Sequence, residues 1–397
     1  MNFVFVSLQR INTDRGSTST NLARELARQQ HNVLYVNSPV DRKDFLFPPK
    51  NPYIQAHIRA IRAKEEPLLQ LSPHLWMLHP IHLVDSFNWV PSTALFSWLL
   101  KINNSRLAQD IKQALDKLNF DEYILINDKD IFRGFHLQEY LRASKYFYLD
   151  RDYTIGLPYW RRHGPVLEPA LMRKADAVFC NSLEFTARAL QHNSNSYYLG
   201  NGFDSVQFSK SPRQLIPVDL AEVPSPRIGY VGAIITMRLD LVLLIELALA
   251  RPSWNFVFIG WEDEAFEKSR LHELHNVFFL GRKHTEEVSI YIEHFDVCIN
   301  PQVANDITMN NFPLKVLEYL ALGKPVVATI TNTMKEVFSE HVYLASNLIG
   351  YLTQIKKALD ESTQQRVQQR IKFVEKFSWK NIAKYFIELS KQVEKKP

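Results

Sequence analysis

The sequence has little of what marks secreted, membrane-spanning or metal-binding proteins. Its two cysteines lie in apolar runs, AVFC at Cys180 and DVCIN at Cys298, so we expect buried, reduced thiols and neither a disulfide nor a metal pair. No apolar run approaches the ~18 residues of a membrane span, and LFSWLLK at 95–101 is far too short. The start, MNFVFVSL, has no basic segment and no small-residue cleavage site, so we expect no signal peptide.

The chain also lacks a strong charge bias, repeats and low-complexity segments. Lys and Arg number 47 against 42 Asp and Glu, a formal net charge of +5, and the basic residues form no stripe of the kind that nucleic-acid binders carry. We therefore expect a globular cytoplasmic protein with no nucleic-acid partner. A weak attraction to anionic lipid headgroups is compatible with this charge, which would place the protein at the inner face of the membrane.

What the sequence does contain is an alternation of short apolar runs, rich in Val, Ile, Phe and Tyr, with stretches of helical period. The expected strands are 3–8, 33–37, 123–127, 146–150, 177–181 and 197–201, then 228–232, 256–260, 277–281, 297–300 and 326–329. The expected helices include 21–30, 105–118, 239–250 and 314–322. Continuous apolar strands separated by helices predict parallel sheets covered on both faces, the doubly wound α/β class.

A proline-rich segment at 209–227, SKSPRQLIPVDLAEVPSPR, separates two halves of domain size. We expect Rossmann-like domains at 1–208 and 228–376, with an amphipathic closing helix at 377–397. The region 38–105 is rich in proline and aromatic residues and shows no regular period. We interpret it as an irregular insertion near the ligand site.

The stretch 303–329, VANDITMNNFPLKVLEYLALGKPVVAT, is typical of an anion-binding turn. A strand ends before it, a loop of small and amide residues follows, and a helix opens near Pro313 and closes at Gly323. The free N–H groups at the start of such a helix attract an anion. A cation in the first turn, Lys315, opposes the helix dipole unless an anion is near, and Glu318 can accept hydrogen bonds from a ribose. The alternative is an ordinary polar loop with both side chains in solvent.

Several segments resemble the GT4-type glycosyltransferases of the GT-B fold, in particular their polysaccharide-biosynthesis branch. PLKVLEYLALGKPVVAT at 313–329 is similar to the family's C-terminal signature, which follows a Thr-rich loop. Four further segments match, so the resemblance covers nearly the whole chain: KADAVFCNSLEF at 174–185, NGFDSVQF at 201–208, RIGYVGAI at 227–234 and FSWKNIA at 377–383.

The resemblance implies two Rossmann-like domains that face a central cleft, with the acceptor on the first, the donor on the second, and the closing helix returning to the first. It implies transfer of a hexose from a nucleoside-diphosphate sugar to a saccharide or lipid-linked saccharide, with retention, and with no metal or cofactor. The donor-binding residues it suggests are Glu318, Lys315, Arg238, Asn310, Asn311, Thr308, Pro313, Leu314, Gly232, Gly16, Gly260, Gly281 and Arg282.

Two positions depart from the family pattern. The family carries a Glu-x7-Glu pair in which the first Glu faces the transferred sugar, but here Asn310 stands in the first position and Glu318 in the second. The family also clamps the diphosphate with an Arg and a Lys after the first strand of the second domain. When Gly232 is aligned, Ala233 stands at the Arg position and Arg238 at the Lys position, and Lys315 is our candidate to compensate.

Two Asp-x-Asp pairs, 128–130 and 150–152, follow apolar strands in the first half. A metal site would need further oxygen ligands, and the two-domain pattern argues against it. We place Asp150 and Asp152, with Asp128 as a weaker candidate, at the floor of the ligand site as contacts for an acceptor hydroxyl or as the base. The alternative is capping of strand ends, with Arg151 as the partner.

Other features are weaker. Gly16, after the first strand, suits a loop close to a diphosphate, and Gly260, Gly281 and Arg282 lie where a nucleobase slot is expected. His163, in YWRRHGP, fits a structural histidine better than a catalytic one. The aromatic residues of the insertion could stack on sugars, although core packing is the simpler explanation: Trp76, Phe87, Trp89 and Trp98.

Two rival functions remain open at this stage. One is a sugar-nucleotide epimerase on the same fold. The other is a nucleotide-sugar-binding subunit without catalysis, which the departures at Asn310 and Ala233 suggest.

Overall fold

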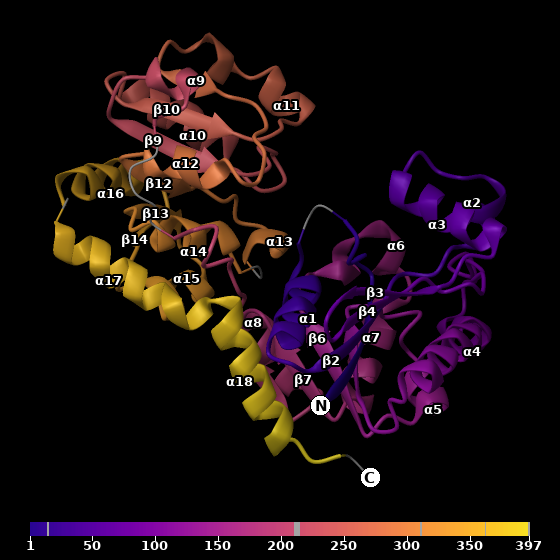
Figure 1. The fold of residues 1–397 in the computed structure, drawn as a ribbon. Helices are drawn as coiled ribbons and strands as arrows, with labels where there is room; N and C mark the ends of the chain where they lie inside the picture. Colours follow the sequence, from indigo (N-terminus) through magenta and orange to yellow (C-terminus); the bar gives the residue numbers. More distant parts are fainter. Residues whose placement is uncertain (14–15, 210–214, 310–311, 362, 396–397) are drawn as a thin grey trace. The chain divides into compact units, whose positions relative to one another are not determined.

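The computed structural model of the protein describes residues 1–13, 16–209, 215–309, 312–361 and 363–395. It consists of two compact units (Figure 1). The first combines Met1–Gly200 with Ile382–Pro397, and the second is Asn201–Asn381. Each unit contains its own sheet with helices packed against it.

The first unit is built on an eight-stranded sheet of order β3-β4-β2-β1-β5-β6-β7-β8. All neighbouring strands are parallel except the edge pair β3 and β4. The inner strands are buried almost throughout, as expected for a sheet covered on both faces. In sheet order, the strands are β3 (Leu68–Ser72), β4 (Leu75–Leu78), β2 (Asn32–Val36), β1 (Asn2–Ser7), β5 (Ile124–Asp128), β6 (Lys145–Asp150), β7 (Ala177–Cys180) and β8 (Ser196–Tyr198).

The helices of the first unit begin at polar residues that cap them. Ser17 forms a capping box with Thr20 at the start of α1, and Ser182 accepts a hydrogen bond from the Phe185 N–H at the start of α8. The helices are α1 (Thr18–Arg28), α2 (Arg42–Leu46), α3 (Pro52–Ala63), α4 (Thr93–Leu118), α5 (Leu137–Leu141), α6 (Pro158–Arg161), α7 (Gly164–Lys174) and α8 (Leu183–Leu190), with a 3₁₀ turn at Thr154–Gly156.

The region 38–105 is not the irregular insertion that its composition predicts. It contains α2, α3, β3, β4 and the first half of α4, and β4 pairs with β2 in register, with Val33 opposite Leu75. The helix α4 begins at the Ser92 cap and therefore starts well before the expected residue 105. Its N-terminal half exposes several large apolar side chains, which hides the usual amphipathic period of a surface helix.

The second unit contains a six-stranded, fully parallel sheet of order β11-β10-β9-β12-β13-β14. Its strands are β11 (Val277–Phe279), β10 (Asn255–Ile259), β9 (Arg227–Val231), β12 (Val297–Asn300), β13 (Val326–Thr329) and β14 (Tyr343–Ala345). Its helices are α9 (Val218–Ala221), α10 (Leu241–Ala250), α11 (Glu264–Glu267), α12 (Val288–Glu293), α13 (Asp306–Met309), α14 (Leu314–Ala321), α15 (Asn332–Phe338), α16 (Leu348–Asp360) and α17 (Gln364–Val374), with 3₁₀ turns at Arg270–Glu273 and Glu375–Phe377.

The last helix, α18 (Trp379–Gln392), begins in the second unit and continues in the first. In the second unit, Trp379 lies against Gly202, where an added Cβ would meet the indole ring at 2.4 Å. In the first unit, the Phe386 ring packs against Phe3, Phe147 and Phe179, with ring centroids 4.8–6.1 Å apart. The apolar stripe of the predicted closing helix is therefore buried.

The predicted fold class is confirmed, since both halves are α/β with parallel sheets. Every strand expected from the apolar runs is present, with ends that differ by a few residues. Both cysteines are buried and unbonded. None of the helices in the described part of the chain combines the length and the apolar character that crossing a membrane requires.

Candidate functional site

Three neighbouring strands of the second unit end in glycine turns at the same edge of the sheet. Gly232, Gly260 and Gly281 follow β9, β10 and β11, and the N–H of Gly260 donates to the carbonyl of Gly281 at 3.0 Å. Gly232 has φ +141° and Gly260 φ +156°. A Cβ on Gly260 would lie 1.8 Å from the carbonyl oxygen of Gly232, so the two turns approach closely only because residue 260 is glycine.

The helix α14 starts beside this edge without a side-chain cap. Pro313 precedes it, and among the described residues no side chain caps its first turn. Ahead of it lies α13, where Asn305 Oδ1 accepts from the Thr308 N–H at 3.0 Å and Thr308 is buried. The N–H groups of Leu314 and Val316 donate to the carbonyls of Phe312 and Pro313 at 3.0 and 2.9 Å, so the positive end of the helix dipole is what attracts an anion here. The predicted residues Asn310 and Asn311, between the two helices, lie outside the described residues.

Lys315, in the first turn of α14, reaches back to the glycine edge. Its ammonium donates a hydrogen bond to Tyr230 Oη and lies 3.8 Å from the centroid of the Tyr230 ring. A Cβ on Gly232 would be 2.7 Å from Lys315 Nζ, so the missing side chain at Gly232 makes room for the ammonium. The structure thus brings together Lys315 and Gly232, which are far apart in sequence.

The ammonium of Lys315 has no carboxylate ion partner among the described residues. Burial, and secondarily the positive charge of the exposed Arg238, lower the pKa of Lys315 to about 7. Glu318, one turn further along the same face, is also partly buried, and burial raises its pKa to about 7. When Lys315 holds its proton, its charge and that of Arg238 exceed the charge of Glu318 near the start of α14, and a bound anion would neutralise the excess.

The remaining predicted donor-site residues differ in their exposure and in the unit to which they belong. Arg282, after Gly281, is exposed, and its guanidinium carbon lies 5.8 Å from the ring centroid of Trp261. Leu314 is partly buried at the start of α14. Gly16 belongs to the first unit, where it is exposed just ahead of α1, and an added Cβ would meet Asn21 Oδ1 at 2.8 Å.

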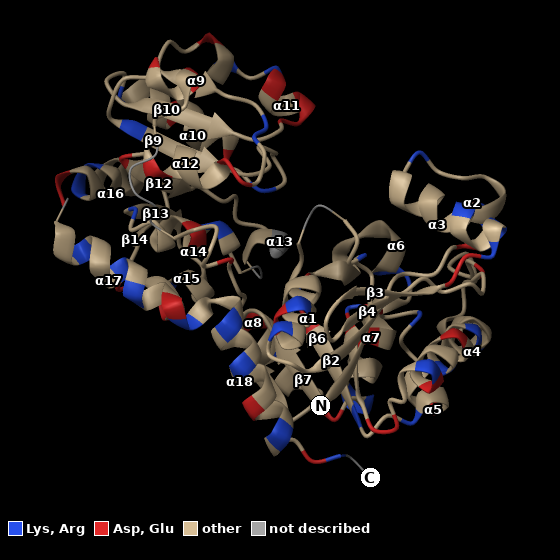
Figure 2. Cartoon of the chain, viewed as in Figure 1, with Lys and Arg blue, Asp and Glu red and all other residues tan. Residues whose placement is uncertain are grey.

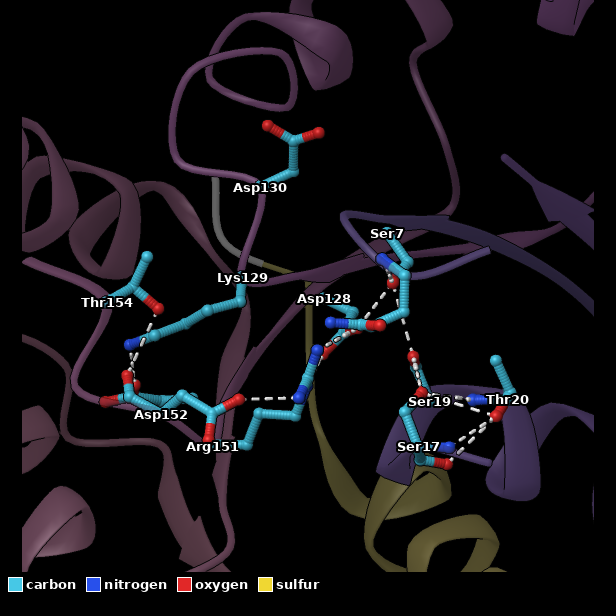
Figure 3. Close-up of polar contacts among 12 residues, drawn as sticks. Ser7, Ser17, Ser19, Thr20, Asp128, Lys129, Asp130, Arg151, Asp152 and Thr154 are labelled. Atoms are coloured by element: carbon cyan, nitrogen blue, oxygen red, sulfur yellow. Dashed lines mark hydrogen bonds and ion pairs between the residues drawn. The ribbon is translucent and has the colours of Figure 1, made fainter. Parts of the chain in front are cut away.

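In the first unit, the predicted Asp128 is part of a buried ion pair (Figure 3). Its carboxylate accepts from Ser7 Oγ at 2.6 Å and from Arg151 Nε at 2.6 Å, and it is fully buried. The same guanidinium donates to Asp152 at 2.6 Å. The carboxylate of Asp152 is 53% exposed, so of the three predicted carboxylates it is the one that a ligand can reach.

Asp150 is not the open carboxylate that we expect from the sequence. Its side chain is fully buried, and it accepts hydrogen bonds from Lys129 and from Arg188 Nη2, the latter at 2.6 Å. Lys129 also donates to Glu168 at 2.5 Å. Because its oxygens are committed to the buried Lys129 and the partly buried Arg188, Asp150 cannot contact an acceptor hydroxyl or act as a base in this arrangement, and strand-end pairing explains it better.

The Asp-x-Asp pairs do not form an ion site in the described structure. Asp128 faces Arg151, whereas Asp130 points away from it (Figure 3). Among the described residues, no group of three or more His, Cys, Asp and Glu side chains is placed to hold a metal ion. His163 is buried, with its ring stacked 4.0 Å from that of Phe96, in agreement with a structural role.

Sequence reasoning missed the partners of these residues. Tyr230 and Arg188 lie in apolar stretches that give no sign of an ionic contact. In the sequence, Lys129 stands between two aspartates, but this pattern does not reveal that its side chain points into the core. The aromatic residues of 38–105 fall into packed and exposed groups. Trp76 packs against Phe120 with ring centroids 6.0 Å apart, whereas Trp89 and Trp98 are 73% and 60% exposed.

Part of the second unit matches a family of known proteins. Residues 225–382 match the family model described as glycosyl transferases group 1. A Bacillus subtilis (strain 168) protein named for a teichuronic acid biosynthesis glycosyltransferase, TuaH, is 28% identical over 184 residues. That alignment covers 44% of this chain and 46% of the relative, so the chain spans about half the length of the curated relative that it matches.

Solved structures share the fold over the whole chain. Sucrose-phosphate synthase from Thermosynechococcus elongatus matches with a TM-score of 0.65 and 17% identity, over 98% of both chains. Anabaena Alr3699/HepE in complex with UDP-glucose matches with a TM-score of 0.64 and 15% identity, over 99% of this chain and 100% of the other. An E. coli trehalose-6-phosphate structure bound with UDP-2-fluoro glucose matches with a TM-score of 0.67 and 13% identity, over 100% of both. At these identities the likeness shows the fold alone, the GT-B fold.

Proposed function

We propose that the protein transfers a hexose from a nucleoside-diphosphate sugar to a saccharide or lipid-linked saccharide, because residues 225–382 match the glycosyl transferases group 1 model and the chain has the GT-B fold. One observation carries this proposal. The ammonium of Lys315 lies at the glycine turn after β9, at the start of an uncapped helix, and has no carboxylate ion partner among the described residues. That is where a diphosphate would be held.

In this proposal, the protein stabilises the negative charge that grows on the leaving diphosphate as the glycosidic bond breaks. Lys315, Arg238 and the positive end of the α14 dipole supply the stabilising charge, so the reaction needs no metal ion. Glu318 accepts hydrogen bonds from the ribose hydroxyls through its carboxylate. The close approach of Gly232 and Gly260 leaves room for the nucleotide to lie against the backbone.

The acceptor side of the proposal is the synthesis of a bacterial surface polysaccharide, with retention at the transferred sugar. The printed name of TuaH, which assigns that relative to teichuronic acid biosynthesis, supports this role. We further propose that the protein works in the cytoplasm at the inner face of the membrane, where a lipid-linked acceptor would be found. Asp152, whose carboxylate is exposed, is our candidate to contact the acceptor hydroxyl.

The proposal is tested by a thermal-shift screen against UDP-, GDP-, ADP- and TDP-sugars in the presence of EDTA, starting with UDP-sugars. We expect one nucleotide family to raise the melting temperature of the wild-type chain. Lys315→Gln and Arg238→Gln should each weaken that nucleotide by ~10- to 100-fold, since each removes a charged hydrogen bond. Arg251→Gln, an exposed arginine of the same unit beside Trp254, serves as the control.

A different result, nucleotide-sugar binding without transfer, would favour the rival function of a binding subunit. A chain that binds nucleotide-sugar but transfers nothing to any saccharide acceptor would be a binding subunit without catalysis. The burial of Asp128 and Asp150 favours this rival, since it leaves Asp152 as the one exposed carboxylate of the three predicted. No shift with any of the four families would contradict both functions.

A further inference from the structure

Two arginines and two histidines also gather at the carboxyl edge of the first sheet. Arg10 follows β1, His79 follows β4 and Arg133 follows β5, while His57 comes from α3. The strands β4, β2, β1 and β5 are consecutive neighbours and parallel, so their carboxyl ends meet at one edge. In doubly wound sheets this edge is where ligands bind.

The two guanidinium groups converge on one residue, Ser38, which lies just after β2. Arg10 Nη2 donates to the backbone carbonyl of Ser38 at 2.9 Å, and Arg133 Nη1 donates to its hydroxyl. Arg10 Nη1 also donates to His57 Nδ1 at 3.1 Å, because the other ring nitrogen of His57 donates to the carbonyl of Pro80 at 2.9 Å. These contacts hold both arginines in place without neutralising them.

Among the described residues, neither guanidinium has an ion-pair partner. Burial, and then the charge of Arg133, lower the pKa of Arg10 to about 10. Burial and the charge of Arg10 lower the pKa of His57 to about 3 and that of His79 to about 4, so both rings are neutral at pH 7.

One acidic group, Asp130, acts on Arg133 from the same loop. Its carboxylate accepts from the backbone N–H of Arg133 at 3.0 Å, and not from the guanidinium. Burial raises the pKa of Asp130, although the charge of Arg133 acts in the opposite direction. Among the described residues, Asp130 forms no ion pair with either guanidinium.

A partly buried pair of like charges costs folding free energy, and proteins keep such costs mainly where function requires them. We propose that Arg10 and Arg133 bind an oxyanion of the acceptor, a phosphate or a carboxylate group, at the carboxyl edge of the first sheet. Guanidinium groups suit either oxyanion, since both accept two parallel hydrogen bonds from the guanidinium fork.

The inference rests on the proposed function in one respect, namely that the anion belongs to the acceptor of that reaction. It narrows the acceptor to two kinds of molecule with the same chemistry. One is a saccharide linked to lipid through a phosphate or diphosphate, and the other is a saccharide that contains an acidic sugar. A neutral oligosaccharide would leave both arginines without a counterion.

The test is titration calorimetry on the full chain with two probes, inorganic pyrophosphate and glucuronate, at matched ionic strength. The titrations use a Lys315→Gln background, which removes the proposed donor-phosphate contact in the second unit. Arg10→Gln and Arg133→Gln should each weaken the bound probe by ~10- to 100-fold. The control is Arg59→Gln, an exposed arginine on α3 that should change nothing.

The probe that binds identifies the source of the oxyanion. Pyrophosphate binding indicates a phosphate-linked acceptor, and glucuronate binding indicates an acidic sugar. If neither probe binds, or if binding is unaffected by both substitutions, the inference is wrong. This result would not bear on the proposed donor site, because that site is tested separately by nucleotide binding to the wild-type chain.

The melting temperature without ligand is a second measurement, and it distinguishes ligand binding by Arg133 from a purely structural role. Without ligand, Arg133→Gln should melt at the same or a higher temperature than the wild-type chain, because it removes a like charge from Arg10 at the loss of one hydrogen bond to Ser38. A large drop in melting temperature would show that Arg133 serves the fold and would overturn the assignment. If Arg10→Gln does not fold, Arg133→Gln carries the test.

Discussion

At Lys315 and Glu318, burial moves two ionisations toward neutral pH from opposite directions. The pKa of Lys315 falls to about 7 and that of Glu318 rises to about 7. Near pH 8 the ligand-free Lys315 is therefore largely neutral, and below pH 6 it is largely charged. A diphosphate beside Lys315 would favour the charged form and would raise its pKa again.

We therefore expect proton uptake when nucleotide-sugar binds at pH 8, and little uptake by Lys315 at pH 6, where it already holds its proton. Titration calorimetry in buffers of different ionisation enthalpy measures this uptake directly. Lys315→Gln should abolish it, whereas Glu318→Gln should retain it. Equal uptake in the wild-type and Lys315→Gln chains would place the diphosphate away from Lys315.

The two predicted carboxylates Asp150 and Asp152 should differ sharply when each is replaced by Asn. Asp150→Asn leaves Lys129 and Arg188 with one buried carboxylate, Glu168, and should reduce the free energy of unfolding by about 3–5 kcal/mol. Asp152→Asn affects a half-exposed pair and should change stability by less than about 0.5 kcal/mol, while it lowers turnover. Chemical denaturation and an acceptor assay measure the two effects. Unchanged turnover in Asp152→Asn would remove it from the site.

At the scale of the element, the N-terminal half of α4 is unusual because its exposed face is apolar. Leu95, Trp98 and Ile102 form one stripe and are 50%, 60% and 38% exposed, and Trp89 in the preceding loop is 73% exposed. The segment 86–106 contains no Asp or Glu. Arg162 donates to the carbonyl of Trp89 at 3.0 Å, which places a cation beside this stripe.

Exposed Trp beside cations is suited to the headgroup region of an anionic membrane. We expect the chain to sediment with phosphatidylglycerol vesicles and much less with phosphatidylcholine vesicles. Trp89→Ser and Trp98→Ser should weaken this binding, whereas Ile349→Ser, at a 76% exposed position of α16, should not. Binding that is equal for both lipids, or equal for all variants, would contradict the role of α4.

The basic residues of the first unit are distributed in a way that agrees with this prediction. Figure 2 shows Lys and Arg on α2, on α3 and in the segment between them. Residues 42–64, which include both helices, contain Asp44 as their one acidic residue. The basic residues of that segment are Arg42, Lys43, Lys50, Arg59, Arg62 and Lys64.

At the scale of the whole molecule, the positive charge of the proposed donor site comes from side chains and a helix start. Transfer should therefore proceed at its full rate in excess EDTA, as measured with the nucleotide family that the thermal-shift screen identifies. A rate that falls with EDTA and returns with Mg²⁺ or Mn²⁺ would show that a metal shares this task. Arg238→Gln should lower the rate in either condition.

Local sequence determined most of the strands and several of the helices, because a buried parallel strand needs a continuous apolar run and such a run is visible on its own. It did not show β3, β4, α2 and α3, which lie in the region 38–105. It also determined which segment carries the helix start at Pro313 and the glycines that precede it. These features depend on neighbours within a few residues, so periodicity and turn chemistry are sufficient to find them.

Only the tertiary structure decided which charges meet. Asp150 is closed off because Lys129 and Arg188 reach it from other elements, and Arg10 and Arg133 converge on Ser38 although they are far apart along the chain. Lys315 reaches the Gly232 turn because α14 starts beside the end of β9. The free energy of a buried charge depends on partners in space, and these are set by the packing of the whole unit.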